Sequence, residues 1–483
     1  MHLSENEGIE GNTFVVTGGA GFVGSALCLE LMRRGADEVR SFDLRKDSPW
    51  LTILRRNGVV CITGDVSRNE DVEKALQGVD CVFHLASYGM SGKEMLQAGR
   101  IDQVNINGTC HVLEACNKHG VRRLVYTSTY NVVYGGKEIV NGNESMQYFP
   151  LDDHVDPYGR SKALAEQLIL KSNARPLKKR RDGKKLYTCA IRPAAIYGPG
   201  EERHLPRIFS LGQMGLLTFK IGEPRVKNDW VYVDNLVHAL LLASMGLLDD
   251  IPGREGTPVA AGQAYFISDG APVNSFEFLR PLIVSLEYTF PRLTISVPTA
   301  LTIAWTFWGI YSLCYPWLNK TWFPRPLILP AEVYKVGVTH YFSILKANQE
   351  LGYIPIVKPE EGMKTTITYW KEKKKAELDT PNIFIWLYIT FGMFLLFCVA
   401  FIPLPYLGPL NWVRWFGILL FRSVRNLQIL FYAATLLHVG EAIYAYFLAR
   451  RVDQANARGW FWQTFALGFP SLRLLLKRAK AKQ

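Results

Sequence analysis

Cysteine is scarce in this sequence, with eight among 483 residues. None forms a C-x-x-C pair, so the spacing excludes the common redox and zinc motifs. Several lie in segments that we predict to be buried, and we interpret them as free thiols of a reducing compartment. The first twelve residues are polar and acidic, so we expect no signal peptide there and a first domain that faces the cytosol.

Acidic residues are scarce in the C-terminal tail. From Asn382 onward eleven Lys and Arg residues accompany two acids, Glu441 and Asp453, which gives +9 of the chain's formal net charge of +12. The basic residues lie beside long uncharged runs, a pattern typical of membrane segments. No DNA-reading motif accompanies them, so we expect a lipid bilayer as partner and no nucleic acid.

A glycine-rich turn is the clearest functional pattern near the N-terminus. Residues 14–24 predict a buried strand, a turn and the start of a helix, with glycines spaced G-x-x-G-x-x-G. Gly18 allows the tight turn, Gly21 lets the backbone approach a pyrophosphate, and Gly24 lets the helix pack on the strand. The helix N-terminus also offers N–H groups to phosphates, although a turn that serves only helix packing is the alternative. The predicted phosphate contacts are Gly18, Gly21, Phe22, Val23 and Gly24.

An acidic residue ends the second predicted strand, Glu38–Asp43, and lies 25 residues beyond Gly18. A carboxylate at this place holds the hydroxyls of an adenosine ribose and repels a 2′-phosphate, so we predict NAD rather than NADP as the cofactor. Arg45 argues against this choice of NAD, since an arginine beside the acid can accept the 2′-phosphate of NADP.

Strand and helix patterns alternate through the first half of the chain, as a parallel sheet requires. The predicted strands after Glu38–Asp43 are 59–63, 81–85, 124–128 and 187–191, and the predicted helices are 22–34, 69–76, 101–119 and 158–171. We therefore predict an α/β fold: a Rossmann-type doubly wound parallel sheet with a smaller interleaved substrate lobe and a C-terminal transmembrane helical region.

Small and polar residues follow two of these strands. Asp65 follows the strand 59–63, where it would either reach an adenine ring or cap the helix 69–76. Ala86 and Ser87 follow the strand 81–85, where small side chains would let a cofactor pass. We therefore expect the cofactor to lie along the carboxyl ends of the strands.

A tyrosine and a lysine are spaced for proton transfer about thirty residues after the strand 124–128. That strand ends in a cluster of hydroxyls, and Pro157 then begins a helix that carries Tyr158 and Lys162 on one face. A phenol has a pKa of about 10, and a nearby ammonium lowers it, so that the phenolate can take a proton from a substrate hydroxyl. The same spacing recurs at Tyr369 and Lys373, which we interpret as a solvated segment without a nucleotide.

These motifs together resemble those of the extended short-chain dehydrogenase/reductases. They are T-G-G-A-G-F-V-G at 17–24, H-L-A-S at 84–87, Y-T-S-T at 126–129, Y-x-x-x-K at 158–162, R-P at 192–193 and W-V-Y-V-D-N at 230–235, together with Asp43, Asp65 and Asn105. Within that group the chain is most similar to the 3β-hydroxysteroid dehydrogenase/isomerase family, nearest its family 42E branch, over roughly residues 10–370.

The resemblance implies roles for individual residues. Tyr158 would be the catalytic base, Lys162 would partner the phenolate and the nicotinamide ribose, and a Ser or Thr would polarise the substrate oxygen. Thr129 stands where many relatives carry serine, and Ser128 beside it leaves that assignment open. The implied cofactor contacts beyond the glycine turn are Asp43, Arg45, Asp65, Val66, Ala86, Ser87, Asn105, Tyr158, Lys162 and Pro193.

Two segments interrupt the α/β pattern. Residues 175–185 hold seven basic residues and one acid, which we interpret as a solvated loop rather than a nuclear-localisation or lipid-binding segment. Residues 295–318 are uncharged and long enough to span a bilayer, but the family's soluble pattern resumes at 334–353. We therefore favour a helix that dips into the membrane surface at the mouth of the substrate site.

The tail begins after a charged linker, 371–381. Residues 382–404 carry no charge and fourteen Leu, Ile, Val or Phe residues, which predicts a transmembrane helix. The lysines before it predict that its N-terminal end lies in the cytosol.

Two weaker apolar runs follow. The run 428–449 contains Glu441 near its middle, with His438 one turn earlier. An intramembrane carboxylate is a candidate functional group, and a hydrogen bond that joins helices is the alternative that we favour. The run 459–476 is interrupted by a proline and an arginine, which is compatible with a hairpin.

We therefore expect a membrane-bound, NAD-dependent enzyme that oxidises the 3β-hydroxyl of a steroid or sterol to the ketone. The expected domains are 1–375, with its nucleotide core mainly at 10–195 and 226–245 and its substrate lobe mainly at 196–225 and 246–370, and the membrane domain 376–483. The expected location is the endoplasmic reticulum membrane, with the catalytic domain in the cytosol.

Two other functions stay open on the sequence. One is a sugar-nucleotide epimerase or dehydratase, for which Arg203, Arg207 and Arg225 would bind phosphates. The other is an NAD-binding membrane scaffold without catalysis, whose tail joins a complex of lipid enzymes. A steroid or sterol substrate is the expected small-molecule partner, and a homodimer is a further candidate assembly.

Overall fold

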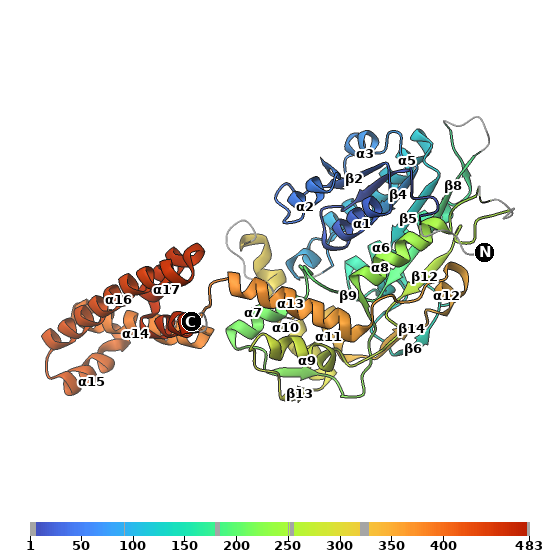
Figure 1. Cartoon of the computed structure of the whole chain (residues 1–483). Coiled ribbons are helices and arrows are strands. Elements are labelled where there is room, and N and C mark those ends of the chain that lie inside the picture. Colours follow the sequence, from blue (N-terminus) through green and yellow to red (C-terminus); the bar gives the residue numbers. More distant parts are fainter. Residues whose placement is uncertain are drawn as a thin grey trace. The chain divides into compact units, whose positions relative to one another are not determined.

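A computed structural model describes residues 6–480 apart from 91, 179–183, 250, 252–255 and 319–327. The chain divides into two compact units, which we call the sheet unit and the tail unit. Within the described residues, the sheet unit comprises 6–204, Phe219–Pro281 and Leu293–Thr366, and the tail unit comprises Leu205–Thr218, Leu282–Arg292 and 367–480. Two short segments of the expected substrate lobe, Leu205–Thr218 and Leu282–Arg292, belong to the tail unit, as do residues 367–375 of the expected first domain. Figure 1 labels the helices and strands of the chain.

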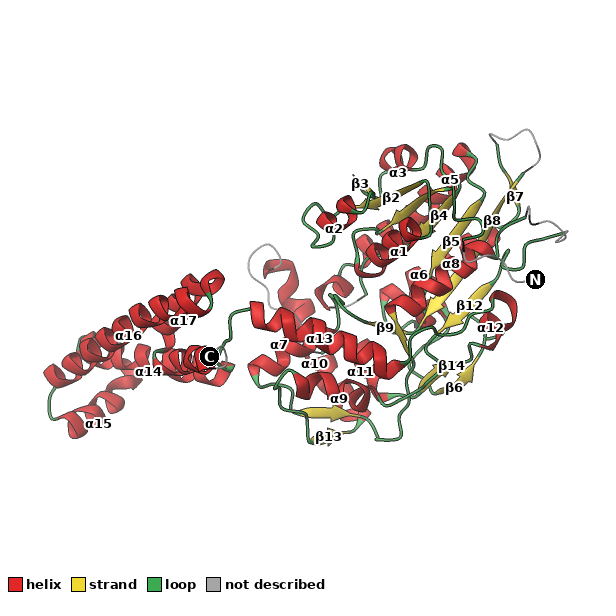
Figure 2. Ribbon diagram, viewed as in Figure 1, coloured by secondary structure: helices red, strands yellow, loops and turns green. Residues whose placement is uncertain are grey.

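The sheet unit is built on a sheet with the strand order β12-β8-β5-β4-β1-β2-β3 (Figure 2). The strands are β1 (Thr13–Thr17), β2 (Glu38–Asp43), β3 (Val60–Thr63), β4 (Cys81–His84), β5 (Arg123–Thr127), β8 (Lys185–Pro193) and β12 (Ala264–Ile267). Neighbours along this path are all parallel. In β1 the side chains of Phe14, Val15 and Val16 are all buried, as a parallel sheet covered on both faces requires.

Helices cover both faces of this sheet, which confirms the predicted doubly wound fold. The helices of the first face are α1 (Phe22–Arg33), α8 (Val233–Met245) and α12 (Leu345–Leu351), and those of the second face are α3 (Asn69–Ala75), α5 (Gly108–His119) and α6 (Pro157–Lys171). Val16 lies in the core of the first face and Val15 in the core of the second. Successive residues of β1 therefore enter opposite cores, as the two-residue period of a strand dictates.

Two local predictions differ from the structure. The single helix predicted at 101–119 is instead α4 (Ala98–Asp102), a π-helical turn η2 (Gln103–Asn107) and α5. The predicted loop 175–185 lies partly outside the described residues, and its described ends form a short antiparallel ladder in which β7 (Arg175–Pro176) pairs with the start of β8. A π turn inserts one residue into a helix, which the apolar pattern alone does not reveal.

The remaining elements of the sheet unit form small parallel pairs and helices around the sheet. The pairs are β9 (Ala195–Tyr197) with β11 (Trp230–Tyr232), β10 (Phe219–Ile221) with β13 (Leu293–Ile295), and β6 (Ile139–Gly142) with β14 (His340–Phe342). The helices include α10 (Val297–Leu318) and α11 (Pro330–Gly337).

Helix α10 packs by one narrow side and exposes large apolar side chains on the other. Ala300 and Ala304 are buried in a cluster with Ile221 and Val333 of the sheet unit. Trp317 is 84% exposed, and other large apolar residues of this helix are also exposed. Although α10 is long and apolar enough to cross a membrane, its first half is therefore part of the packing of the sheet unit.

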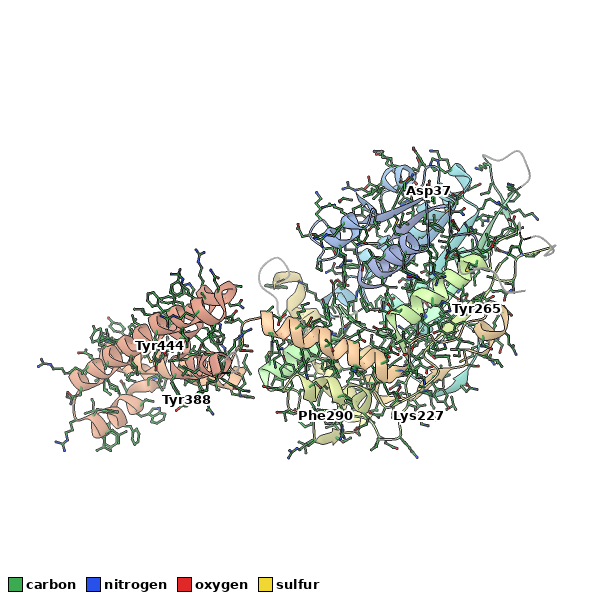
Figure 3. The ribbon with its side chains drawn as sticks, viewed as in Figure 1. Asp37, Lys227, Tyr265, Phe290, Tyr388 and Tyr444 are labelled. Carbon is green, nitrogen blue, oxygen red and sulfur yellow. The ribbon has the colours of Figure 1, made fainter. Side chains whose placement is uncertain are left out.

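The tail unit contains the predicted transmembrane region. Its C-terminal helices are α14 (Ile383–Phe401), α15 (Asn411–Phe421), α16 (Val424–Val452), α17 (Ala457–Leu467) and α18 (Phe469–Lys480). Among the described residues, α10, α14 and α16 are the helices long and apolar enough to span a bilayer. Tyr388 of α14 and Tyr444 of α16, labelled in Figure 3, are both exposed, in keeping with a surface that contacts lipid.

The segment predicted as a charged linker, 371–381, makes contacts with the tail. Helix α13 (Pro359–Ala376) continues through most of it. Asn456, Gln463 and Arg478 then donate to the backbone carbonyls of residues 376, 379 and 377, at 2.8, 2.9 and 2.8 Å. The side chain of Leu378 packs against the apolar core formed by α16, α17 and α18. We call residues 376–379 the junction segment.

The segment around the second Tyr-Lys pair, which we predicted to be solvated, is exposed on one side and buried on the other. Tyr369 and Lys373 lie in α13, and Trp370 between them is buried. The Trp370 ring lies edge-on to Phe209 of α7 (Leu205–Met214), with ring centroids 4.9 Å apart. The part of α13 from residue 367 onward therefore packs through Trp370 within the tail unit.

His438 and Glu441 meet the bend between α17 and α18. His438 Nδ1 lies 3.0 Å from the carbonyl oxygen of Phe465, so this side chain joins α16 to α17, whereas Glu441 Oε2 is buried without a hydrogen-bond partner among the described residues. The bend is at Gly468, which has a φ of +65°. A Cβ there would lie 2.8 Å from His438 Nε2 and 2.9 Å from Glu441 Oε2, so the close approach of the bend requires glycine.

Candidate active site

The glycine turn closes tightly between β1 and α1. Gly18 has a φ of +71°, and a Cβ there would lie 3.0 Å from the backbone nitrogen of Ala86. A Cβ on Gly24 would lie 2.2 Å from the carbonyl oxygen of Gly18. The predicted roles of these two glycines therefore have a steric basis, since neither position accommodates a side chain.

The N-terminus of α1 fits a phosphate group. Its N-cap is Gly21, which has no side chain to satisfy the first-turn N–H groups. The side chains of Phe22 and Val23 pack into an apolar cluster with Tyr197, so contacts from these two residues would come from their backbone N–H groups. The positive end of the helix dipole favours an anion at the same place.

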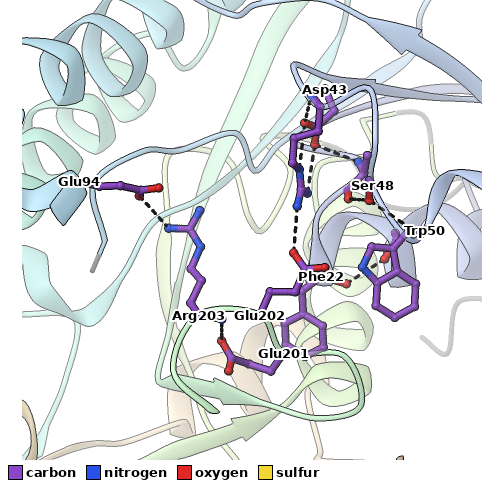
Figure 4. Close-up of polar contacts among 11 residues, drawn as sticks. Phe22, Asp43, Ser48, Trp50, Glu94, Glu201, Glu202 and Arg203 are labelled. Carbon is purple, nitrogen blue, oxygen red and sulfur yellow. Dashed lines mark hydrogen bonds and ion pairs between the residues drawn. The ribbon is translucent and has the colours of Figure 1, made fainter. Parts of the chain in front are cut away.

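Asp43 is held at the carboxyl end of β2, with its side chain 10% exposed. Its carboxylate accepts the N–H of Ala20 at 3.1 Å and the N–H of Arg45 at 2.9 Å. The Arg45 side chain turns back along the carboxylate, with Nε 3.3 Å from Asp43 Oδ1 (Figure 4). The predicted ribose-binding acid therefore stands beside the glycine turn in an ion pair with the arginine that follows it.

The structure rejects one of the two alternatives for Asp65. The N-cap of α3 is Arg68, so Asp65 does not cap that helix. Its carboxylate instead accepts the N–H of Ser67 at 2.9 Å, within its own turn. Val66, the other predicted contact here, is buried in the core between the sheet and its second helical face.

A chain of buried hydrogen bonds fixes the end of β4. Thr17 Oγ1 lies 2.7 Å from His84 Nδ1, and His84 Nε2 lies 3.0 Å from Thr109 Oγ1. Burial, with a smaller effect of the Lys162 charge, lowers the pKa of His84 to about 3, so its ring is neutral. Thr17 also accepts the N–H of Ala86 at 3.1 Å. The sequence did not predict these roles of Thr17 and Thr109, because the partners lie in separate elements.

Asn105 positions the loop that follows β4. Its amide oxygen accepts the N–H of Tyr88 at 2.8 Å, and its nitrogen donates to the Tyr88 carbonyl and to Ser161 Oγ, each at 2.9 Å. The π turn η2 carries this buried side chain between the loop and α6. Any effect of Asn105 on a cofactor would therefore pass through the loop it holds.

The other predicted contacts lie at strand ends on the same edge of the sheet. Ala86 and Ser87 follow β4, Thr129 follows β5, and Pro193 is the last residue of β8. Because these strands are parallel to β1 and β2, their carboxyl ends share one edge with the glycine turn and Asp43.

Tyr158 and Lys162 come from the first two turns of α6. The helix begins at Asp156, whose carboxylate accepts a first-turn N–H at 2.6 Å, and Pro157 occupies its first position. Both the Tyr158 and the Lys162 side chains are buried. Lys162 Nζ donates to the carbonyl oxygen of Thr127 at 2.6 Å, so the lysine is directed to the end of β5.

The predicted lowering of the phenol pKa by the lysine is wrong for this structure. Burial raises the pKa of Tyr158 to about 12, and the opposing influences among the described residues are the charge of Arg203 and a hydrogen bond with Ser87. Burial likewise lowers the pKa of Lys162 to about 7, against the opposing charge of Glu166. The physical reason is that the Lys162 ammonium donates to the backbone carbonyl of Thr127, and that burial disfavours the charged forms of both side chains.

The structure distinguishes the two candidate hydroxyls at the end of β5. The Ser128 hydroxyl donates to the buried carboxylate of Glu166. Thr129 Oγ1 accepts the N–H of Asn131 at 3.3 Å, which leaves the Thr129 hydroxyl proton to donate elsewhere. Of the two, Thr129 is therefore the better candidate to polarise a substrate oxygen.

Glu166 is a residue of the site region that the sequence analysis missed. It is fully buried, and it accepts from Tyr148 at 2.7 Å and pairs with Arg192 at 2.5 Å. The sequence spacing could have identified Glu166. Tyr158, Lys162 and Glu166 follow one another at four-residue intervals, which places them on one face of a helix.

A small cavity lies beside the start of α6. Its lining includes Asn131, Tyr134, His154, Tyr334 and Lys335. It has room for little more than one water molecule, against the roughly 300–1,000 Å³ of a usual ligand pocket, so this cavity alone does not hold a steroid.

The parallel sheet, the glycine turn and the Tyr158–Lys162 pair together define a short-chain dehydrogenase/reductase. The chain belongs to the 3-beta hydroxysteroid dehydrogenase/isomerase family, whose sequence profile matches residues 15–297. Short-chain dehydrogenase/reductase family 42E member 1 of Macaca fascicularis is 49% identical over 343 residues, 71% of this chain and 83% of that protein. A 3-beta-hydroxysteroid dehydrogenase of Mycolicibacterium neoaurum is 36% identical over 366 residues, 74% of this chain and 91% of that protein.

Solved structures share the fold. A dTDP-glucose 4,6-dehydratase of Streptomyces venezuelae with NAD bound has a TM-score of 0.54 and 24% identity, over 75% of this chain and 97% of its own. An epimerase from Methanothermobacter thermautotrophicus has a TM-score of 0.55 and 22% identity, over 77% and 95%. The predicted NAD cofactor agrees with the NAD named in the first of these. In the tail, the profile of transmembrane protein 254 matches residues 384–477.

Proposed function

We propose that the protein is a membrane-bound, NAD-dependent dehydrogenase that oxidises the 3β-hydroxyl of a steroid or sterol to the ketone. The observation that carries the proposal is the buried Tyr158 phenol at the edge of the sheet that also holds the glycine turn and Asp43. Membership of the 3-beta hydroxysteroid dehydrogenase/isomerase family and the bacterial relative named for this activity support the substrate class.

Each residue of the site would have its own role in removing the proton of the substrate hydroxyl. Thr129 donates a hydrogen bond to the substrate oxygen and keeps its proton, and the Tyr158 phenolate takes the proton of the substrate hydroxyl. The Ser87 hydroxyl holds the phenol by a hydrogen bond. NAD, when bound, supplies the acceptor for the hydride that leaves C3. Gly18 and Asp43 would orient the cofactor through its phosphates and its adenosine ribose.

Entry of the substrate from the membrane would suit an apolar molecule such as a steroid or sterol. Helix α10 exposes large apolar residues, among them Trp305, Leu313 and Trp317, while its first half packs in the sheet unit. We propose that this exposed side lies in the membrane surface, where aromatic side chains are favoured. A sterol would then reach the sheet unit from the lipid phase.

The sugar-nucleotide alternative is less well supported. It needs arginines that are open to a diphosphate, yet Arg225 is paired with Glu223 at 2.5 Å and Arg203 with Glu94 at 3.8 Å. These two of the three arginines named for this alternative therefore already have a carboxylate partner within the sheet unit. A substrate diphosphate would have to displace both.

The proposal is tested with full-length protein purified in detergent. NAD reduction is measured with a panel of 3β-hydroxysteroids and 3β-hydroxysterols, with and without a 4-carboxylate, and with UDP-glucose and dTDP-glucose as controls. We expect turnover on at least one sterol or steroid and none on the sugar nucleotides. Tight NADH binding without turnover of any sterol would overturn the dehydrogenase proposal and favour the scaffold, and turnover of a sugar nucleotide would favour the epimerase class.

The pH dependence of the two reaction directions should differ. Oxidation requires the phenolate of Tyr158, and with a pKa of about 12 the phenolate fraction rises tenfold per pH unit below that value. We expect kcat/KM for oxidation to increase about tenfold per unit between pH 7 and 9, while ketone reduction, which requires the protonated phenol, stays nearly flat. Initial rates in both directions check this. A plateau of oxidation near pH 7 would contradict it and indicate that the Lys162 ammonium acts on the phenol in the working enzyme.

A further inference from the structure

The loop after β9 carries two oppositely charged neighbours that reach different partners. Glu202 Oε2 lies 3.0 Å from Arg45 Nη1, and Arg203 Nη1 lies 3.8 Å from Glu94 Oε2 (Figure 4). The preceding residue, Glu201, is buried and accepts the N–H of Arg203 at 2.7 Å. The backbone of this loop is therefore fixed by one carboxylate while the next two side chains extend from it.

The Arg45 guanidinium is enclosed by two carboxylates next to the glycine turn. Asp43 contacts its Nε and Nη2, and Glu202 contacts its Nη1. A Cβ on Gly21 would lie 3.0 Å from Arg45 Nη2, so the guanidinium lies directly beside the predicted pyrophosphate turn. Arg45 is the residue that would otherwise accept the 2′-phosphate of NADP.

We propose that Glu202 is a cofactor-specificity residue, which excludes NADP by holding Arg45. Asp43 alone leaves one edge of the guanidinium free, and an arginine with a free edge binds phosphate through paired hydrogen bonds. Glu202 occupies that edge from a loop 157 residues away in sequence. The proposal deepens the NAD assignment of the proposed function and rests on it.

The charges of this cluster explain the direction of the effect. Asp43, Arg45 and Glu202 together carry one net negative charge, and a 2′-phosphate of about −1.5 to −2 charge at neutral pH is repelled. Without the Glu202 charge the cluster is neutral and one side of Arg45 can turn to the phosphate. NAD has only hydroxyls at this position, so its binding through Asp43 changes little.

The test compares NADH and NADPH binding to full-length protein by cofactor fluorescence, which does not depend on turnover. For Glu202→Gln we expect the affinity for NADPH relative to NADH to rise about tenfold, with NADH affinity changed by no more than about threefold. Glu223→Gln is the matched control, because it removes the same charge from an exposed pair of the same unit. Adding Arg45→Ala to Glu202→Gln should cancel the gain.

The outcomes separate the possibilities cleanly. An unchanged ratio in Glu202→Gln, with NADH still bound, would overturn the role of Glu202. An equal rise in Glu223→Gln would also overturn it, by assigning the effect to net charge. Wild-type protein that binds neither cofactor would instead contradict the NAD assignment itself.

Discussion

A Tyr158→Phe variant is expected to oxidise the sterol substrate about 10²–10⁴-fold more slowly than the wild type while it still binds NADH. The substitution removes the hydroxyl that takes the substrate proton and keeps the ring, which is buried at the start of α6. The glycine turn and Asp43, which would hold the nucleotide, are on other elements. The measurement is kcat for NAD reduction together with NADH fluorescence titration.

The chain supplies its own control for this substitution. Tyr369 forms a second Tyr-x-x-x-Lys pair with Lys373, in α13 and in the other unit of the chain from the glycine turn. Tyr369→Phe should keep nearly the full rate. A rate for Tyr158→Phe within tenfold of the wild type would show that another group takes the proton, and an equal loss in both variants would indicate damage to the fold.

Glu166→Ala is expected to destabilise the sheet unit by about 3–5 kcal/mol, the usual effect of breaking a buried ion pair from one side. The Glu166 and Arg192 side chains are 0% and 4% exposed, so the arginine would be left charged and unpaired in the interior. Ser128 and Tyr148 would lose their acceptor as well. The measurement is the denaturant midpoint of the full-length protein, followed by NADH binding.

Two variants make this result specific. Glu73→Ala removes an acid from an exposed pair with Lys118 and should cost less than about 1 kcal/mol. Glu166→Met combined with Arg192→Met should be less destabilising than Glu166→Ala, because neither charge is then buried alone. A loss in Glu166→Ala as small as that in Glu73→Ala would mean that the interior readily admits water.

Local signals made the nucleotide half of the chain predictable. The G-x-x-G-x-x-G spacing, the acid at Asp43 and the four-residue step from Tyr158 to Lys162 each lie within one or two adjacent elements. Apolar strands that alternate with helices then predict that the strands are parallel, because each helical crossover returns the chain to the edge of the sheet at which the preceding strand began. Both the sheet and its two helical faces follow from that pattern.

Contacts between distant segments were not predictable in the same way. Glu202 meets Arg45 only because the loop after β9 returns to the end of β2, and no local spacing encodes that return. The direction of Lys162 depends on a carbonyl of β5, and its pKa depends on burial that a sequence does not display. The π turn at Asn105 similarly depends on the partners of that side chain in the loop and in α6.

Composition also gave a wrong expectation for the basic segment of α13, where charged residues were taken to indicate exposure. The segment around Tyr369 and Lys373 was predicted to be solvated, yet Trp370 is buried and Lys374 lies over the Tyr288 ring, 4.3 Å from its centroid. Long basic side chains cover apolar surface with their methylene stems, so a run of lysines does not establish that the backbone beneath is free.

The junction segment makes contacts like those of a peptide bound to a receptor. Three side chains from separate parts of the tail hold its carbonyls, and Leu378 packs against the apolar core of α16–α18. These are the contacts by which receptors recognise short ligands: backbone hydrogen bonds for affinity and one buried anchor for specificity. Residues 376–379 are therefore held to α16–α18 by the kinds of contact that hold a peptide in its receptor, in addition to the continuity of the polypeptide.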